Sequence, residues 1–531
     1  MGNYSQYKNV NIVFGDTKGI VVPSGNGTTD RPGSPAVGTL RYNTDIGLVE
    51  QYNANGWQGI DSSPTVSNIS GTIFFDVSST ITINGANFKS GSVVYVEGSG
   101  VSGIPRALAT TFVSTSQLTA VTASDSVNYV GGQTFNIRVS NPSGLSGLLQ
   151  PAGTIDREAV WSTASATYTV FDTGRGNNLT FTASDPDGAT ITYSLVSGSL
   201  PSGASLNSSN GQIGPFNAVG SDTTSNFVLG ATSTSAAGTA YTTNRSFAIT
   251  VKAPVVVTFS SVGTTSWTAP TGLTSARVLV VAGGGAGGTR NSGISPGGTD
   301  GGAGGGAGGM VDVPSFPISP GSPYSIQVGG GGGNNSNPGP AQGSPGTPSY
   351  FGPLTAIGGG GGGAGPGGPV ANGLDGGSGG GRGGGGSPNT GVTGSGTQPA
   401  QPGLSGSNGY GNRGGYNPNV NPYTGAGGGG ANAVGSDGGS GSVGNGGSGR
   451  PSTITGSSIN YSGGGGGAAF PNGPVGPGSG GSGGGGNGGD AGNGSGRAAS
   501  YYGGGGGGGA GAPAPGGDGG AGYQGIVIIR Y

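Results

Sequence analysis

The chain has 531 residues, of which 133 are glycine, and it contains neither cysteine nor histidine. With 18 basic and 20 acidic residues its net charge is −2, so no basic stripe is available to hold a nucleic acid backbone. The missing residue types exclude disulfide bonds, Ser-His-Asp and Cys-His catalytic sites and the usual zinc sites. We expect no cofactor, no nucleic acid partner and no enzyme activity.

The high glycine content raises the question of whether the chain is ordered. Charged residues make up 7% of it, against roughly 25% in ordinary proteins. Disordered chains usually combine high charge with few aromatic residues, whereas this chain has 19 Tyr, 15 Phe and 3 Trp. The composition therefore predicts a polar but ordered protein.

Residues 1–62 hold strand-length apolar runs separated by turn-forming residues: NVNIVF, GIVV, GTLRYN and GLVEQYN. The start, MGNYSQYKNV, lacks the apolar segment of a secretory signal, and no run of about 18 apolar residues predicts a membrane span. We expect a small β module, in a protein that does not use the standard export route.

Two further segments alternate apolar and polar residues with a period of two. Residues 63–150 include TIFFDV, TITING, SVVYVEG and TFNIRVSN, and residues 151–253 include ATYTVFD, LTFTAS, ITYSLVSG and RSFAITVKA. This period, with about ten residues between runs, is typical of antiparallel sandwiches. The sequence predicts one β-sandwich in each segment.

Residues 254–531 are runs of glycine bracketed by two apolar segments, 276–282 and 525–531. Unbroken glycine at 358–363 and 503–509 excludes collagen, which needs glycine at every third position only. Extended three-residue-per-turn helices remain possible if neighbouring segments satisfy their backbone groups. The alternative is a flexible glycine-rich tail. We predict packed polyglycine II helices clamped by the bracketing strands, and hence an all-β fold overall.

Residues 20–60 carry the elements PSG, RP, GTLRYNT, GLVEQYN and GW. Together they resemble a short module found in virion fibre proteins of tailed phages, which implies attachment to other virion proteins through the region 1–62. We expect five apolar side chains to form the small buried face of a hairpin in this module: Leu40, Tyr42, Val49, Tyr52 and Trp57.

The two sandwich segments also have resemblances. Residues 64–141, with STITINGANFKSGSVVYVEG, resemble an IPT/TIG immunoglobulin-like module, and residues 178–251, with LTFTASDPDGATITYSL, resemble cadherin-like domains. Cadherins bind Ca²⁺ through aspartate-rich junctions, so the resemblance makes Asp185 and Asp187 weak calcium candidates. A DPDG turn also forms without any metal.

The segment SWTAPTGLTSARVLVVAGGGAGG, the glycine islands and the final GYQGIVIIRY are similar to the glycine-rich domain of phage tail fibres and adhesins. The resemblance implies a virion protein assembled in the host cytoplasm and exposed outside the cell. Its domain 254–531 would be a tip that recognises a polysaccharide or outer-membrane protein of the host. Phage fibres are often trimers, so a homotrimer is one possible assembly.

Glycine has no side chain with which to read a ligand, so the insertions between glycine runs are the candidate site. The longest, 387–424, holds Tyr410, Arg413, Tyr416 and Tyr423, residue types favoured at recognition surfaces. An equally open alternative is that these rings cap the glycine bundle. We favour capping for Tyr350, Phe351, Tyr501 and Tyr502, which lie beside glycine runs.

Three other functions remain open at this point. The chain could be a decoration fibre on the head or neck of a virion, or a bacterial surface adhesin. A polysaccharide depolymerase is weaker, because the few acidic residues of the second half sit singly in glycine turns rather than as a catalytic pair.

Overall fold

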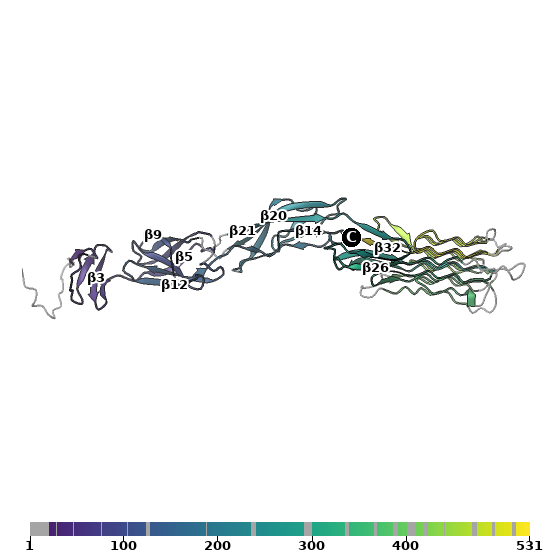
Figure 1. Cartoon of the computed structure of the whole chain (residues 1–531), viewed down its shortest axis with the longest axis horizontal. Coiled ribbons are helices and arrows are strands. Elements are labelled where there is room, and N and C mark those ends of the chain that lie inside the picture. The colour runs from purple at the N-terminus through teal and green to yellow at the C-terminus, as the bar shows by residue number, and fades with distance from the viewer. Residues whose placement is uncertain are drawn as a thin grey trace, which may run out of the picture.

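Four β-rich bodies follow one another along an elongated rod in the computed structural model of the chain (Figure 1). The structure describes residues 21–531 except 28, 46, 76, 104, 124–127, 187, 235–239, 291–299, 335–338, 366–368, 386–390, 401–408, 419, 421–422, 440, 470–474, 491–493 and 512–516. Helices within this part are single 3₁₀ turns, η2 (Asp172–Gly174) and η3 (Pro369–Ala371). The fold is all-β, as predicted.

The first body is a single four-stranded sheet in which β1 runs parallel to β2 and the other pairs are antiparallel. Its strands are β1 (Ser24–Gly25), β2 (Leu40–Asn43), β3 (Leu48–Asn53) and β4 (Gly56–Gly59).

Polar side chains fill the interior of this first body. Arg41, Asn43 and Glu50 are each at most 3% exposed. Arg31 donates to Oε1 of Glu50 at 2.6 Å, and Asn43 donates to the same oxygen at 2.8 Å. The expected buried apolar face is therefore wrong for Leu40 and Tyr42, which are 41% and 38% exposed. Successive side chains of β2 point to opposite faces of the sheet. Because Arg41 and Asn43 point to the buried face, Leu40 and Tyr42 point to the solvent-exposed face.

The second body is a sandwich of two antiparallel sheets, in the orders β5-β6-β10-β9 and β12-β11-β7-β8. Its core contains fully buried residues from both sheets, among them Ile83, Leu118, Phe135 and Ile137. The strands are β5 (Thr65–Ser70), β6 (Thr80–Ala86), β7 (Val93–Glu97), β8 (Arg106–Ala107), β9 (Ala109–Ser114), β10 (Gln117–Val121), β11 (Thr134–Ser140) and β12 (Ser146–Thr154).

The third body packs a four-stranded sheet, β14-β21-β20-β17, against shorter sheets β15-β19-β18 and β13-β16. An aromatic cluster that includes Trp161, Phe181 and Phe247 fills its core. The strands are β13 (Val160–Trp161), β14 (Thr167–Val170), β15 (Leu179–Thr180), β16 (Ala183–Ser184), β17 (Ile191–Gly198), β18 (Ser205–Leu206), β19 (Gln212–Gly214), β20 (Thr223–Thr234) and β21 (Ala240–Val251).

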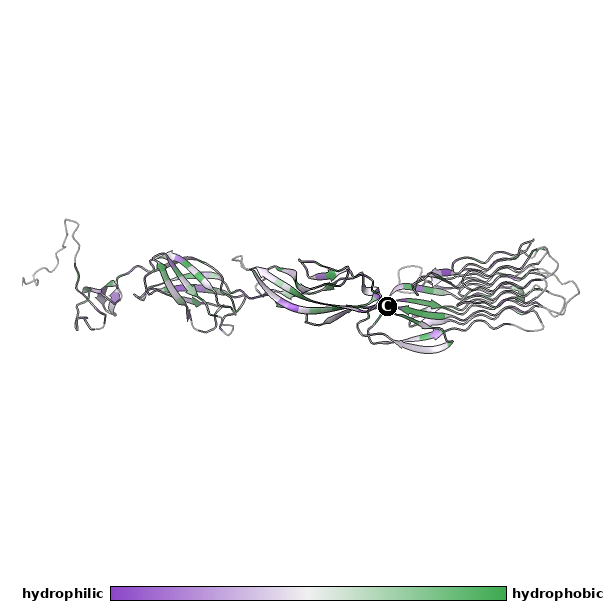
Figure 2. Cartoon of the chain, turned by 90° about the horizontal axis from the view of Figure 1, so that it is seen from above, coloured by the Kyte–Doolittle hydropathy of each residue, from purple (hydrophilic) through white to green (hydrophobic). Residues whose placement is uncertain are grey.

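The fourth body has a β-sandwich base from which the glycine segments project (Figure 2). The base consists of the sheets β22-β32-β24-β25-β29 and β23-β26-β27-β28, with β30-β31 as a separate pair. The strands are β22 (Val256–Phe259), β23 (Gly263–Thr268), β24 (Ser275–Val281), β25 (Met310–Pro317), β26 (Pro323–Val328), β27 (Ser349–Phe351), β28 (Leu354–Ala356), β29 (Gly409–Tyr410), β30 (Arg450–Ser452), β31 (Ile459–Tyr461) and β32 (Ile526–Arg530).

The two bracketing apolar segments pair directly. β24 and β32 are antiparallel neighbours, with Val278 opposite Ile529 and Val280 opposite Val527. All four of these side chains are buried in the base. The prediction that the two segments clamp the glycine region is confirmed, and strand β24 continues without a break into the glycine segment 282–290.

Residues 301–309 form the centre of a hydrogen-bonded lattice. Their N–H groups donate in turn to three neighbouring segments, 423–429, 503–509 and 357–363, and this cycle repeats every three residues. The first three pairs, each 2.9 Å long, are Gly301 to Tyr423, Gly302 to Gly509 and Ala303 to Gly363. A period of three is that of a polyproline II-type helix, so these are polyglycine II segments.

The carbonyl groups of residues 301–309 accept from three further segments. Gly288 donates to Ala303, Gly384 to Gly301 and Ala468 to Gly302, at 2.9–3.0 Å. The central segment thus has six bonded neighbours, and all of its residues are buried. A Cβ atom at Gly304 would collide with the carbonyl oxygen of Gly465, so glycine is what allows this close approach.

Candidate functional site

Tyr410, Arg413 and Tyr416 form a row along one side of the glycine bundle. Residues 411–417 belong to an extended helix with three residues per turn, at the rim of the bundle. The carbonyl of Asn412 accepts from the N–H of Gly379. Three residues further along each segment, the carbonyl of Gly415 accepts from the N–H of Arg382. Gly414 and Gly415 face inward and are buried, whereas Arg413 and Tyr416 are exposed. Successive members of the row are about 9 Å apart along the helix, since each turn rises by about three times 3.1 Å.

Tyr410 lies at the base end of the row. It pairs with Met310 where β29 joins β25, and its ring packs against the cluster that contains Leu279 and Val281. The guanidinium carbon of Arg450 lies 3.7 Å from the centre of the ring, a cation–π distance. Tyr410 is therefore half-buried, with one ring face occupied by a positive charge.

Tyr416 lies at the other end of the row and is 41% exposed. Its backbone N–H donates to Oδ1 of Asp437 at 2.7 Å, and its carbonyl accepts from Gly438 at 2.9 Å. Arg382 lies 5.4 Å from the centre of the ring. The neighbouring segments thus hold the backbone of Tyr416 in place while its side chain meets solvent.

Arg413, between the two tyrosines, donates from Nη1 to the carbonyl of Gly414 at 3.0 Å. Among the described residues no carboxylate lies within ion-pair distance of Arg413 or of Arg450. Both guanidinium groups therefore carry positive charge that no described acidic side chain offsets by direct contact.

Tyr423, the fourth residue expected at the site, lies elsewhere. It belongs to the next segment of the chain, forms a bridge with Asp300, and its carbonyl accepts from Gly301 in the centre of the lattice. The structure brings together three of the four expected residues. Of the insertion 387–424, residues 387–390, 401–408, 419 and 421–422 lie outside the described part of the chain.

The aromatic residues expected to cap the bundle, Tyr350, Phe351, Tyr501 and Tyr502, lie where strands meet glycine segments. Phe351 is fully buried in the base and stacks on Tyr324 at 5.1 Å, while Tyr350 is partly exposed beside it. Tyr461, Tyr501 and Tyr502 form a chain of ring contacts. Burial raises the pKa of the Tyr461 hydroxyl far above its ordinary value.

Arg382, Arg450 and Asp437 border the row but do not stand out in the sequence. Each lies in a glycine-rich stretch of the sequence and is separated by about 20 to 40 positions from the tyrosine that it approaches in the structure. Only their glycine contexts, GGGRGGG, GGSGRPS and VGSDGGS, mark them as side chains on the lattice. The partner of each could not be found without knowing which glycine segments are neighbours.

The calcium candidates remain unsupported. Oδ1 of Asp185 accepts from the N–H of Ala189 at 3.2 Å, and its carbonyl accepts from Gly188, as a turn requires. Asp187 lies outside the described residues. Within the described part of the chain, no three acidic side chains gather as metal ligands would.

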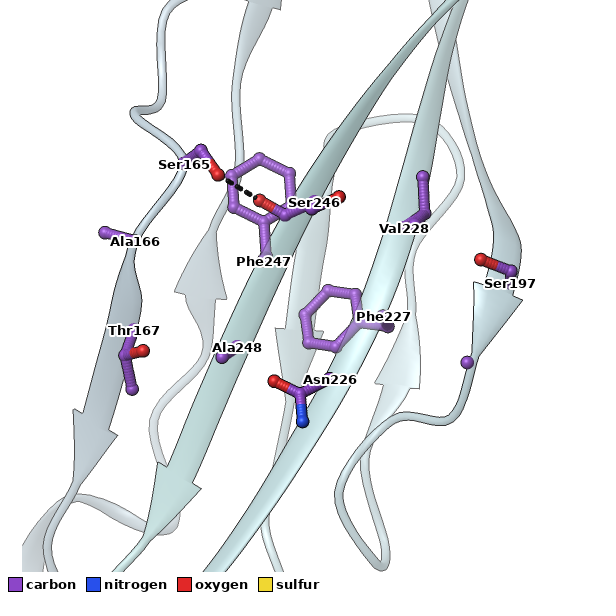
Figure 3. A pocket seen from close by; sticks show the side chains of 11 residues that line it. Ser165, Ala166, Thr167, Ser197, Asn226, Phe227, Val228, Ser246, Phe247 and Ala248 are labelled. Carbon is purple, nitrogen blue, oxygen red and sulfur yellow. Dashed lines mark hydrogen bonds between the residues drawn. The ribbon is translucent and has the colours of Figure 1, made fainter.

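A shallow hollow lies on the third body, over β14, β21, β20 and β17 (Figure 3). Small or neutral side chains line it, including Ser165, Ser246, Ala248 and Asn226, and Ser165 donates to the carbonyl of Ser246 at 2.6 Å. None of its lining residues is ionisable, so they offer no acid or base for catalysis.

Residues 259–531 match the family model described as a glycine-rich domain. No curated protein matches the chain. Among solved structures, the extracellular domain of protocadherin GammaB4 is 16% identical over 41% of this chain and 40% of its own, with a TM-score of 0.19. The insect immune protein hemolin is 14% identical over 38% of this chain and 49% of its own, with a TM-score of 0.20.

The endo-fucoidan hydrolase MfFcnA4 from glycoside hydrolase family 107 is 13% identical over 41% of this chain and 38% of its own, with a TM-score of 0.17. The chain thus spans less than half the length of each of these three structures. No helix in the described part of the chain is long and apolar enough to cross a bilayer.

Proposed function

The chain belongs to the glycine-rich domain family, and from that premise we propose that it is a non-enzymatic fibre protein of a tailed bacteriophage whose glycine-rich end recognises and attaches to the host surface. The observation that carries the proposal is the row Tyr410, Arg413 and Tyr416, displayed on a rigid lattice at one end of a rod.

The arrangement of the bodies supports a fibre. The first body lies at one end of the rod and the glycine bundle at the other, with the two sandwich modules between them (Figure 1). The C-terminus lies at the joint between the third and fourth bodies, where Tyr531 exchanges backbone hydrogen bonds with Val255. The far end of the rod is therefore made of glycine segments, and the first body, at the opposite end, is the part that we propose joins other virion proteins.

Rigidity supports a recognition role for this end. The hydrogen-bonded lattice holds the backbone of the rim in place without a partner, so binding needs little further ordering of the chain beyond the side chains themselves. Tyrosine and arginine are the side chains that most often dominate binding surfaces. Glycine supplies the scaffold, and the few side chains on the rim supply the contacts.

The full-length chain tests the proposal. Purified protein should bind susceptible cells, should not bind a resistant derivative, and should compete with phage for adsorption. Labelled antibody should mark the tail end of the particle. Absence of binding and competition would contradict the adhesive function, and label on the head or neck would replace it with a decoration fibre.

A further inference from the structure

We propose that the row Tyr410, Arg413 and Tyr416 binds an acidic polysaccharide that lies along the side of the glycine bundle. The inference rests on the proposed function and adds to it the class of ligand and the surface that takes it.

Charge is the first reason. The guanidinium groups of Arg413 and Arg450 lie at the row, and among the described residues no carboxylate is within ion-pair distance of either. The nearby carboxylates of Asp375 and Asp437 accept from the backbone N–H groups of Ser395 and Tyr416 instead. Two cationic side chains without a direct acidic partner favour an anionic ligand.

Arginines elsewhere in the chain show the contrast. Arg530 pairs with Asp172 at 2.7 Å, Arg277 with Asp312 at 2.8 Å and Arg138 with Glu97 at 3.0 Å. These pairs account for their arginines structurally. Within the described part of the chain, Arg413 donates to the carbonyl of its neighbour Gly414 and has no carboxylate partner, so its planar fork is available for two parallel hydrogen bonds to a carboxylate or sulfate.

The tyrosine rings are the second reason. An aromatic ring offers a flat apolar face and a polar hydroxyl, which suits a ligand with both apolar and polar surfaces, such as a pyranose ring. Tyr416 is the more open of the two, at 41% exposed, since Tyr410 packs partly against the base. Aromatic, cationic and aromatic groups thus alternate along the row.

The spacing is the third reason. The three-residue period of the helix sets the groups in a straight line about 9 Å apart. A compact ligand would meet only one of them, whereas an extended polymer with repeated acidic groups meets all three.

A protein partner fits this surface less well. A stable protein interface buries about 800 Å² on each side around an apolar centre. The segments beside the row, 391–398 and 433–438, carry mainly glycine and small polar residues. Their exposed apolar side chains, Val392 and Val434, come singly from separate segments.

The test measures binding of the full-length chain to polygalacturonate, dextran sulfate and neutral dextran. We expect one or both acidic polymers to bind at least tenfold more tightly than dextran, more weakly as salt rises. Preference between the two polymers identifies a carboxylate or a sulfate as the acidic group. Equal affinity for all three polymers, or binding to none, overturns the inference.

Variants locate the site. Arg413→Ala and Tyr416→Ala should each weaken binding about tenfold, and Arg413→Lys should restore it only in part, because lysine keeps the charge but not the fork. Arg497→Ala, another exposed arginine on a glycine segment, is the matched control and should bind as the unmodified chain does. Equal effects of Arg413→Ala and Arg497→Ala would assign binding to general charge rather than to the row.

Cell binding separates this inference from the proposed function. If the unmodified chain binds cells and Arg413→Ala and Tyr416→Ala bind them equally well, the row is not the site but the chain remains an adhesin. If the unmodified chain does not bind cells at all, the proposed function fails whatever the polysaccharides show. Unchanged thermal unfolding of each variant confirms that the lattice is intact.

Discussion

Arg530, the penultimate residue, donates from Nε to Oδ2 of Asp172 at 2.7 Å, across 358 positions of the sequence. Asp172 also pairs with Arg175 at 2.7 Å, so one carboxylate of the third body holds a guanidinium group from each side of the joint. Thr173 donates to the carbonyl of Ser275 nearby. The last strand therefore fastens the glycine-rich body to the module before it.

Replacing this carboxylate should loosen the joint. Asp172→Asn keeps the shape of the side chain but removes the negative charge that pairs with Arg175 and Arg530. Because a hydrogen bond to a charged group contributes about 1.5–3 kcal/mol to stability, the substitution should weaken the joint by a similar amount. We expect a lower unfolding temperature of the glycine-rich body by calorimetry and a broader range of shapes by solution scattering.

Asp222→Asn is the control for this change. Its partner Lys252 is as close, at 2.7 Å, but both side chains are more than a third exposed. Solvent screens such a pair, so the effect should be clearly smaller. Equal effects of the two substitutions would mean that Asp172 has no special role at the joint.

A side chain at the centre of the lattice should not be tolerated. In Gly304→Ala the added methyl group would collide with the carbonyl oxygen of Gly465, and backbone cannot move aside as a side chain can. Overpacking commonly costs about 1–3 kcal/mol, and we expect at least that loss in the unfolding free energy of the glycine-rich body.

The matched substitution Gly476→Ala has open space around its Cβ position. It should be neutral or stabilise by up to about 1 kcal/mol, because alanine has fewer unfolded conformations than glycine. If calorimetry shows the two alanine variants to be equally stable, close packing does not explain the glycine at position 304.

Asp437 should hold the exposed end of the row in place. Asp437→Ala removes the acceptor for the N–H of Tyr416, which costs about 1 kcal/mol. We expect faster hydrogen exchange at the Tyr416 amide. Asp437→Asn keeps an acceptor oxygen and should exchange nearly as slowly as the unmodified chain. Equally fast exchange in both variants would point to the charge instead of the hydrogen bond.

Alkaline pH should expose the burial of Tyr461. Burial raises the pKa of its hydroxyl in the folded state above the unfolded value near 10. Its contribution to stability is therefore complete below pH 10 and is lost progressively as pH rises further. The stability of the unmodified chain should fall more steeply above pH 10 than that of Tyr461→Phe. Parallel curves for the two proteins would contradict this assignment.

Much of the fold could be predicted from the sequence, because strand period and turn chemistry are local properties. The alternation in TITING and TFNIRVSN predicted strands, and β6 and β11 occupy those positions. The apolar runs at 276–282 and 525–531 predicted their own pairing, since buried neighbouring strands need such surfaces. The unbroken glycine runs excluded collagen and predicted packed extended helices with three residues per turn.

The candidate site was only partly predictable. Tyr410, Arg413 and Tyr416 share a side because of their spacing of three, which the sequence contains. The position of Tyr423 beside Asp300, and the approach of Arg450 to Tyr410, depend on which segments are neighbours. The polar interior around Glu50 was missed because alternation alone does not say which face of a strand is covered.

By itself, then, the sequence determined the building units: strands where apolar residues alternate, and extended helices where glycine leaves no side chain to prevent close packing. Tertiary structure alone decided the neighbours of each glycine segment. Lattice contacts form between backbone groups that are chemically the same in every glycine. The sequence therefore does not show which segment packs against Gly304, nor that Arg450 lies over the ring of Tyr410. Those choices are made by the connections and by the strands that anchor each segment in the base.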